Sequence, residues 1–131
     1  MREILFRGKR MDNGEWVYGY YVHIGPVSCQ RTYIIPEYAS ALYVNEVYPS
    51  TVGQYTGLND KHGKRIFEGD IAKVLQGKDK DIAYVGFENG AFMLYPKTGN
   101  IYERTLWEYW YNDWDVEVIG NITDNQELLE K

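Results

Sequence analysis

The sequence has little of what disulfide frameworks, metal sites and nucleophilic catalysis require. Its 131 residues include one cysteine, Cys29, and two histidines, His23 and His62. A single cysteine cannot form a disulfide within the chain and suits a reducing compartment. A structural zinc site needs about four close ligands, and nucleophilic catalysis needs a nucleophile, a base and an orienting group together. We therefore expect no enzymatic activity, no cofactor and no metal.

Long apolar runs and an excess of positive charge are also missing. No stretch approaches membrane-spanning length, and the residues after Met1 lack the apolar segment of a secretory signal. We therefore expect a cytoplasmic protein with no membrane partner. Acidic residues outnumber basic ones by 19 to 14, and the formal net charge is −5. This balance disfavours non-specific attraction to phosphate backbones, so a protein partner is favoured over nucleic acid.

Aromatic residues and glycine, in contrast, are plentiful. Aromatics make up 16% of the chain, with 13 tyrosines, and there are 13 glycines. Tyr, Trp and Val favour strands, and turn signals recur at short intervals between strand-like runs. The sequence predicts an all-β protein of one domain over 1–131. Within it we expect an N-terminal lobe with a β-hairpin over 1–50, a small bent barrel over 51–122, and a short helix over 124–130.

Two Asn-Gly steps predict tight hairpins, because both residue types tolerate positive φ. Asn13-Gly14 precedes the run 16–24, and Asn89-Gly90 lies between two later strand-like runs. Large side chains alternate along 16–24. This alternation predicts a strand that is covered on much of both faces.

Gly69 lies between two further strand-like runs and predicts a sharp bend or bulge. Glu68 and Asp70 flank it, and one interpretation of this spacing is a carboxylate pair for acid–base chemistry. No partner base is identifiable for acid–base chemistry. We therefore expect a carboxylate at this bend to accept backbone N–H bonds that the disrupted ladder leaves free.

The segment 101–114 gathers aromatic side chains between acidic ones. Its period is unclear, and it forms either a short helix or an irregular segment. Glu108 and Asp113 within it repel phosphates, so a core or subunit-interface role suits it better than base stacking. The candidate interaction residues are Trp107, Tyr109, Trp110, Tyr111 and Trp114.

Two clusters of basic residues support an alternative hypothesis. They are Arg2, Arg7, Lys9 and Arg10 near the start of the chain, and Lys61, Lys64 and Arg65 around a predicted turn. If these side chains converge on one face beside aromatic rings, the protein is a nucleic-acid-binding accessory protein. If they scatter, they are solvated strand ends and turns. The acidic balance of the chain favours the second reading.

Three stretches of the sequence carry a family resemblance that runs from near the first residue to the last. They are 6–10 with 14–19, 51–58 with 60–71, and 116–122 with 124–129. The second stretch contains Thr51-Val-Gly-Gln-Tyr-Thr-Gly-Leu58 and Lys64-Arg-Ile-Phe-Glu-Gly-Asp-Ile71. On these three stretches, the chain resembles the YopX family of bacteriophage and prophage proteins. Two positions depart from the family pattern: Gln126 replaces a usual proline, and Ser50 replaces a common acidic residue.

The resemblance implies an all-β protein with an SH3-like barrel element, encoded by a phage or an integrated element and located in the bacterial host cell. It implies no activity and transfers no catalytic residue. Our main hypothesis is a non-enzymatic β module that binds a host or phage protein, or assembles with itself as a homo-oligomer. Nucleic-acid binding remains the alternative.

Overall fold

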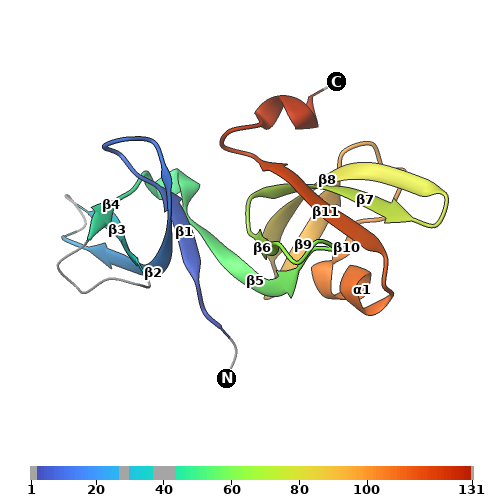
Figure 1. The fold of residues 1–131 in the computed structure, drawn as a ribbon, viewed down its shortest axis with the longest axis horizontal. Coiled ribbons are helices and arrows are strands. Elements are labelled where there is room, and N and C mark those ends of the chain that lie inside the picture. The colour runs from blue at the N-terminus through green and yellow to red at the C-terminus, as the bar shows by residue number, and fades with distance from the viewer. Residues whose placement is uncertain (1–2, 27–29, 37–43, 131) are drawn as a thin grey trace. The chain divides into compact units, whose positions relative to one another are not determined.

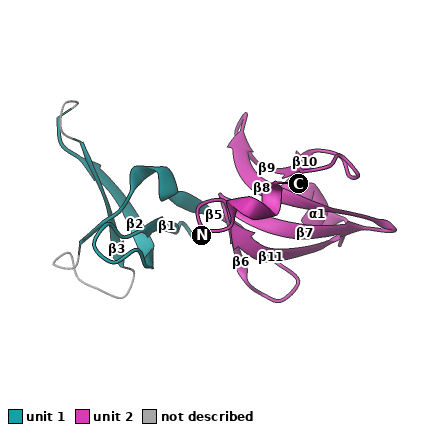
Figure 2. Cartoon of the chain, turned by 90° about the horizontal axis from the view of Figure 1, so that it is seen from above, with its two compact units in different colours: residues 1–55 teal, residues 56–131 magenta. Residues whose placement is uncertain are grey.

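The computed structural model describes residues 3–26, 30–36 and 44–130, so Arg2 and Cys29 lie outside the described residues. The chain divides into two compact units, 1–55 and 56–131 (Figure 2). Strands dominate both units, which confirms the all-β class (Figure 1). Among the described residues, no helix has the length and apolar character needed to cross a membrane.

Unit 1 is an antiparallel arrangement of short strands. Its strands are β1 (Phe6–Lys9), β2 (Trp16–Ile24), β3 (Arg31–Pro36), β4 (Asn45–Glu46) and the start of β5 (Gly53–Asn59), with a 3-10 turn η2 (Pro49–Thr51) before β5. They lie in the order β4-β3-β2-β1-β5. The chain turns between β1 and β2 at Gly14, whose φ is 71°. The predicted hairpin is therefore confirmed, but its turn is wider than a two-residue Asn-Gly turn, because the strand pairing ends at Lys9 and Trp16 and Asn13 does not have a positive φ.

The prediction that strand 16–24 is covered on both faces is wrong. Val17 is buried, but the side chains of Tyr20 and Tyr21 are exposed. Val17 packs with Ile34 and Val47 in a small apolar cluster. The second half of β2 extends past this cluster, so its large rings remain in contact with solvent.

Unit 2 holds a second antiparallel sheet and one short helix. Its elements are the end of β5, β6 (Arg65–Phe67), β7 (Asp70–Gln76), β8 (Asp79–Glu88), β9 (Ala91–Pro96), β10 (Arg104–Thr105), α1 (Leu106–Tyr111), β11 (Asp115–Asn121) and η3 (Gln126–Leu129). The sheet order is β10-β9-β8-β7-β11. Its edge strands β10 and β11 are not neighbours, so the described strands form an open sheet where the sequence predicts a barrel. The chain leaves β10 directly into α1 and returns as β11 on the opposite edge.

The turn between β8 and β9 follows the sequence prediction. Glu88 pairs with Ala91, which leaves a two-residue loop of Asn89 and Gly90. Their φ values are 52° and 82°, the left-handed pair that a twisted hairpin requires. The Asn-Gly hairpin is therefore confirmed.

The bend at Gly69 also has the predicted structure. Gly69 has a φ of 93°, and the chain changes direction there between β6 and β7. The backbone N–H of Phe67 donates to the carboxylate of buried Asp70 over 2.7 Å. Asp70 therefore fixes the bend, in agreement with the structural role expected for a carboxylate at this position.

The C-terminal helix is shorter and tighter than predicted. Residues 126–129 form a 3-10 turn, and Asn125 precedes it without a side-chain cap bond. The Asn125 side chain instead accepts a bond from the N–H of Asn121 over 3.1 Å. Lys97 Nζ donates to the carbonyl oxygens of Leu128 and Glu130 and ties the terminus to the sheet.

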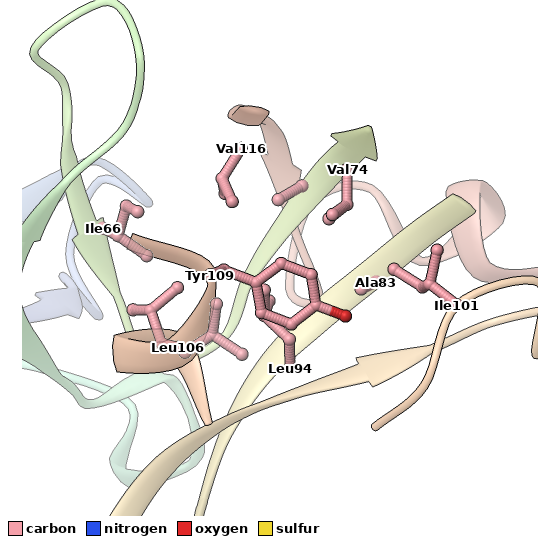
Figure 3. Packing of buried hydrophobic residues seen from close by; sticks show 10 residues of the cluster. Ile66, Val74, Ala83, Leu94, Ile101, Leu106, Tyr109 and Val116 are labelled. Carbon is pink, nitrogen blue, oxygen red and sulfur yellow. The ribbon is translucent and has the colours of Figure 1, made fainter. Parts of the chain in front are cut away.

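The core of unit 2 brings α1 onto the sheet (Figure 3). Tyr109 is 0% exposed and lies among buried aliphatic side chains. Its hydroxyl donates to the carbonyl of Tyr102 over 2.8 Å, so the one polar atom of the ring has a partner. The cluster comprises Ile66, Ala72, Val74, Ala83, Val85, Leu94, Ile101, Leu106, Tyr109 and Val116.

Candidate functional site: the aromatic face of helix α1

Helix α1 begins with a side-chain cap. Thr105 is the N-cap, and its hydroxyl oxygen accepts a bond from the N–H of Glu108 over 3.2 Å. The Glu108 carboxylate in turn lies near the Thr105 hydroxyl and accepts from Arg104 over 3.0 Å. Thr-x-x-Glu is the capping-box spacing, which fixes where a helix starts. The cap matters because a helix of six residues is marginal without such support.

The helix ends in a Schellman motif. The N–H of Asp113 donates to the carbonyl of Trp110, and the N–H of Trp114 donates to the carbonyl of Tyr109. Asp113 has a φ of 56°, the left-handed conformation that this motif places after the C-cap. The rings of Tyr109 and Trp114 meet edge to face with centroids 5.2 Å apart, which supplies the apolar contact that often accompanies the motif.

The spacing of side chains along α1 sorts its rings into two groups. Leu106 and Tyr109 are three residues apart, and both are buried against the sheet. Trp107, Trp110 and Tyr111 stand at i, i+3 and i+4, so they neighbour one another on the exposed side of the helix. Their exposed fractions are 54%, 57% and 67%. We call Trp107, Trp110 and Tyr111 the aromatic face of α1.

Two of these rings hold one another in place. Trp107 and Tyr111 stack with centroids 4.9 Å apart and planes inclined by 23°. A stacked i, i+4 pair limits the rotamers of both rings. The aromatic face is therefore partly ordered before any partner arrives, which lowers the entropy cost of binding.

One cleft borders the aromatic face on the Trp107 side. Its volume is about 420 Å³, and apolar or small side chains from four elements line it. They are Thr56, Leu58, Ala91, Phe92, Thr105, Leu106 and Trp107. The composition suits an apolar side chain of a bound segment.

A second cleft borders the Trp110 side and has a different chemistry. Its volume is about 200 Å³, and its lining combines two tryptophans with several charged groups. The lining residues are Leu58, Asn59, Asp60, Lys61, Ile66, Leu106, Trp110, Asp113, Trp114, Asp115 and Val116. We call it the acidic cleft.

Asp60 anchors one wall of the acidic cleft. Its side chain is buried and accepts backbone N–H bonds from His62, Lys64 and Val118 at 2.9 to 3.0 Å. Burial by itself raises the pKa of Asp60, but these three bonds outweigh it and hold the pKa below the ordinary aspartate value. Asp60 is therefore ionised at neutral pH and joins the 60–64 turn to β11.

Trp114 is held on the other wall of the acidic cleft. The guanidinium carbon of Arg104 lies 5.7 Å from its ring centroid, within the range of a cation–π contact. Tyr109 meets the same indole edge to face. The half-buried Trp114 ring is thus fixed by α1 and by the segment that precedes it.

The five aromatic residues singled out from the sequence therefore have three different environments. Tyr109 belongs to the core, Trp114 is half buried in the cleft wall, and the other three are exposed. Sequence reasoning missed Phe92, Asp60 and Asp115, which complete the two clefts. The capping box and the i, i+3, i+4 spacing were the available signals for the helix and its exposed side. No local signal identifies clefts built from strands far apart in sequence.

The basic residues singled out for nucleic-acid binding are mostly engaged with side chains nearby. In unit 1, Arg7 is buried with its guanidinium 4.8 Å from the Trp16 ring centroid, and Lys9 Nζ lies 5.9 Å from the same ring. Arg10 makes two hydrogen bonds to exposed Asp12.

In unit 2, the basic residues surround the turn that Asp60 organises. Lys61 lies 3.8 Å from the Glu117 carboxylate, Lys64 is exposed, and Arg65 is half buried at the start of β6. The six described candidates are thus divided between the two units, three in each. Nucleic-acid binding by these residues stays a prediction.

A third cleft, of about 310 Å³, brings together Lys73, Lys80 and Lys97 beside Asp81. Asp81 is buried and accepts bonds from the N–H and hydroxyl of Thr98 and from the N–H of Asn100. Burial raises the pKa of Asp81, but these bonds together lower it below the ordinary value. The Asp81 carboxylate offsets part of the positive charge of the three lysines. Lys97 is also engaged, because its Nζ donates to the carbonyl oxygens of Leu128 and Glu130.

The comparisons with known proteins agree with the sequence resemblance and the fold. The family described as YopX protein has a model that matches residues 5–130, which confirms the resemblance. The crystal structure of protein EF1440 from Enterococcus faecalis is similar, with a TM-score of 0.57 and 22% identity over 99% of this chain and 100% of that chain. At this identity the similarity concerns the fold alone. No curated protein sequence matches the chain.

Proposed function

Because the chain belongs to the YopX family and carries an exposed aromatic face on α1, we propose that it is a non-enzymatic module that binds protein partners through this face. The proposal includes the setting that the family resemblance implies, a bacteriophage or prophage protein that acts in the cytoplasm of its bacterial host. The binding surface is the aromatic face together with the two clefts that border it. The partner is a peptide segment of another protein.

The observation that carries the proposal is the exposure of three large rings on one side of a six-residue helix. Exposed tryptophan costs free energy in water, and Trp and Tyr are the residues most enriched among binding hot spots. A surface of this kind becomes favourable when a partner covers it. The clefts on both sides supply depth, which hot-spot residues generally need in order to exclude water.

The buried carboxylates of the described residues have partners within the fold. The buried carboxylates Asp60, Asp70 and Asp81 each accept backbone N–H bonds within the fold. These bonds tie turns and strands together. They give the carboxylates structural roles, and a binding role for the exposed aromatic rings is the hypothesis with most support.

The test uses a phage-displayed library of random peptides, selected against the full chain. Peptides that bind are then titrated against the wild type, Trp110→Ala and Tyr20→Ala. Trp110 and Tyr20 are matched because their exposed fractions are 57% and 55%. We expect Trp110→Ala to weaken binding by about tenfold or more, as truncation of a hot spot does, and Tyr20→Ala to leave it unchanged.

Two results would contradict the proposal. One is selection of peptides whose binding is equally insensitive to both substitutions. The other is a protein that ignores peptides but binds single-stranded DNA at low salt, which would favour the nucleic-acid alternative. Native mass spectrometry of the same proteins tests self-assembly, because a homo-oligomer built on this face dissociates in Trp110→Ala and persists in Tyr20→Ala.

A further inference from the structure

We propose that the acidic cleft receives a lysine or arginine side chain of the bound peptide segment. This inference rests on the proposed function and names the chemistry of its partner. The aromatic face of α1 then covers the neighbouring apolar part of the same segment. A basic residue beside apolar ones is thus the pattern that this surface selects.

Charge complementarity is the first argument. Among the described residues lining the acidic cleft, the carboxylates are Asp60, Asp113 and Asp115 and the cation is Lys61. Three negative charges against one positive leave a formal charge of −2. Lys61 also lies 3.8 Å from Glu117, outside the lining, which reduces its influence further. A clefted surface of one sign attracts the opposite charge and raises its local concentration.

Two of these carboxylates are available to a ligand. Asp113 and Asp115 are exposed, and neither side chain has a hydrogen bond or ion pair within the part of the chain that the structure describes. Asp60, in contrast, uses its oxygens for three backbone N–H groups but keeps its negative charge. The cleft therefore combines a fixed charge in its wall with two carboxylates that can bind a cation directly.

The rings supply the second argument. Trp110 and Trp114 line the same cleft as the carboxylates. Indole has the most favourable π face for a cation, and guanidinium groups also stack on it. Trp114 already makes such a contact with Arg104 at 5.7 Å, and the exposed Trp110 ring is available for a cation from the partner.

The size of the cleft limits its occupant. A volume of about 200 Å³ is below the roughly 300–1,000 Å³ of pockets that hold whole small ligands. One extended side chain suits it better than a cofactor. The larger cleft beside Trp107 is apolar and takes a different part of the segment.

Asp113 supplies a further argument and a clean test. It occupies the left-handed position after the helix, where glycine or asparagine is favoured, and its charge lies at the helix end that favours cations. A neutral asparagine therefore fits this position at least as well. The double substitution Asp113→Asn with Asp115→Asn removes two charges from the cleft, and we expect it to keep the fold because both side chains are exposed.

The experiment uses the peptides selected from the random library. Each is titrated against the wild type, the Asp113→Asn/Asp115→Asn variant and a control, Asp79→Asn/Glu127→Gln, which removes two exposed charges outside the cleft lining. In parallel, each arginine of the peptide is replaced by citrulline, which keeps the shape and removes the charge. Unfolding curves of the variants are recorded to compare their stability.

The inference predicts that selected peptides contain lysine or arginine next to apolar residues. The affinity of these peptides for the Asp113→Asn/Asp115→Asn variant is about tenfold lower than for the wild type, and replacing a peptide arginine by citrulline has a similar effect. Their affinity for the Asp79→Asn/Glu127→Gln control is unchanged. Peptides that depend on Trp110 but bind equally to the cleft variant would overturn the inference and leave the proposed function standing. Peptides that ignore Trp110 would contradict the proposed function itself. The two failures are therefore distinguishable.

Discussion

Strand β2 and helix α1 are both rich in aromatic residues, yet they present their rings in different ways. In β2, Tyr20 and Tyr21 are neighbours in sequence and point to opposite faces, and Tyr21 packs against Phe6 with centroids 5.4 Å apart. In α1, the period of 3.6 buries Tyr109 and places Trp107, Trp110 and Tyr111 on one side. A strand therefore divides its rings between two surfaces, whereas a helix gathers them.

This difference shows why composition alone does not define a binding surface. The exposed rings of β2 lie on a small unit whose described apolar cluster is Val17, Ile34 and Val47. The rings of α1 lie over a larger cluster and beside two clefts. Exposure in β2 follows from limited coverage, and exposure in α1 follows from a helix that is capped, anchored and oriented.

The largest expected effect separates the buried ring of α1 from an exposed ring of β2. Tyr109→Ala should lower the free energy of unfolding by about 3–5 kcal/mol, because it leaves a large cavity in the core. Tyr20→Ala should change it by about 0.5 kcal/mol or less. Urea unfolding followed by tryptophan fluorescence measures both. Equal effects of the two substitutions would contradict the assignment of Tyr109 to the core.

A smaller effect is expected where the acidic cleft is anchored. Asp60→Asn should destabilise the protein by about 1–3 kcal/mol at pH 7, because the amide cannot satisfy three N–H donors as the carboxylate does. Burial raises the pKa of Asp60 and its three bonds lower it, with a net decrease. The stabilisation is then complete above the ordinary aspartate pKa of about 4 and disappears as the pH falls through the lower folded value.

Denaturant unfolding of both proteins between neutral and acidic pH checks this pH dependence. The difference between the wild type and Asp60→Asn should shrink only below about pH 4. Asp113→Asn is the control, since Asp113 lies on the same cleft and its carboxylate has no described partner. A difference that is constant down to strongly acidic pH would contradict the role of the ionised Asp60.

The cap of α1 should have an effect of about 1 kcal/mol. Thr105→Ala removes the side-chain acceptor for the N–H of Glu108 and should lower stability by roughly that amount, whereas Thr105→Ser keeps the hydroxyl. Loss of the cap should also weaken peptide binding, because the first turn carries Trp107. Stability unchanged in Thr105→Ala would show that packing alone holds the helix.

The smallest effect concerns an exposed ion pair in unit 1. A hydrogen bond from Arg10 lowers the pKa of Asp12. Arg10→Ala should raise this pKa towards that of an ordinary aspartate, with little change in stability. An NMR titration of the Asp12 carboxyl carbon measures the shift. An unchanged pKa would show that Arg10 is not held by Asp12 and is available for other partners.

Local signals in the sequence predicted local structure well. The Asn89-Gly90 hairpin and the bend at Gly69 with its Asp70 carboxylate follow from φ preferences and side-chain hydrogen bonding. For 101–114 the sequence left a short helix and an irregular segment open, and the structure has the helix. The all-β class follows from strand propensity and closely spaced turns. Each of these features depends on residues that are near one another in the chain.

Features that depend on distant residues were not predicted. Whether β10 and β11 close a barrel depends on strand order, and the exposure of β2 depends on how far its apolar cluster extends. The acidic cleft joins Asp60 of one turn to Asp113 and Asp115 after α1, a separation of more than 50 residues. One local signal would have distinguished the buried from the exposed aromatic residues of 101–114. The Thr105-x-x-Glu108 capping box sets where the helix starts, and the start determines which side chains share a face.

The most direct test of the account is the affinity of selected peptides for Trp110→Ala compared with Tyr20→Ala. The two side chains have nearly equal exposure, one on the helix and one on the strand. Our account predicts that the helix substitution weakens binding by about tenfold or more and that the strand substitution has no effect. Equal losses in both variants, or loss in Tyr20→Ala alone, would contradict the claim that the aromatic face of α1 is the binding surface.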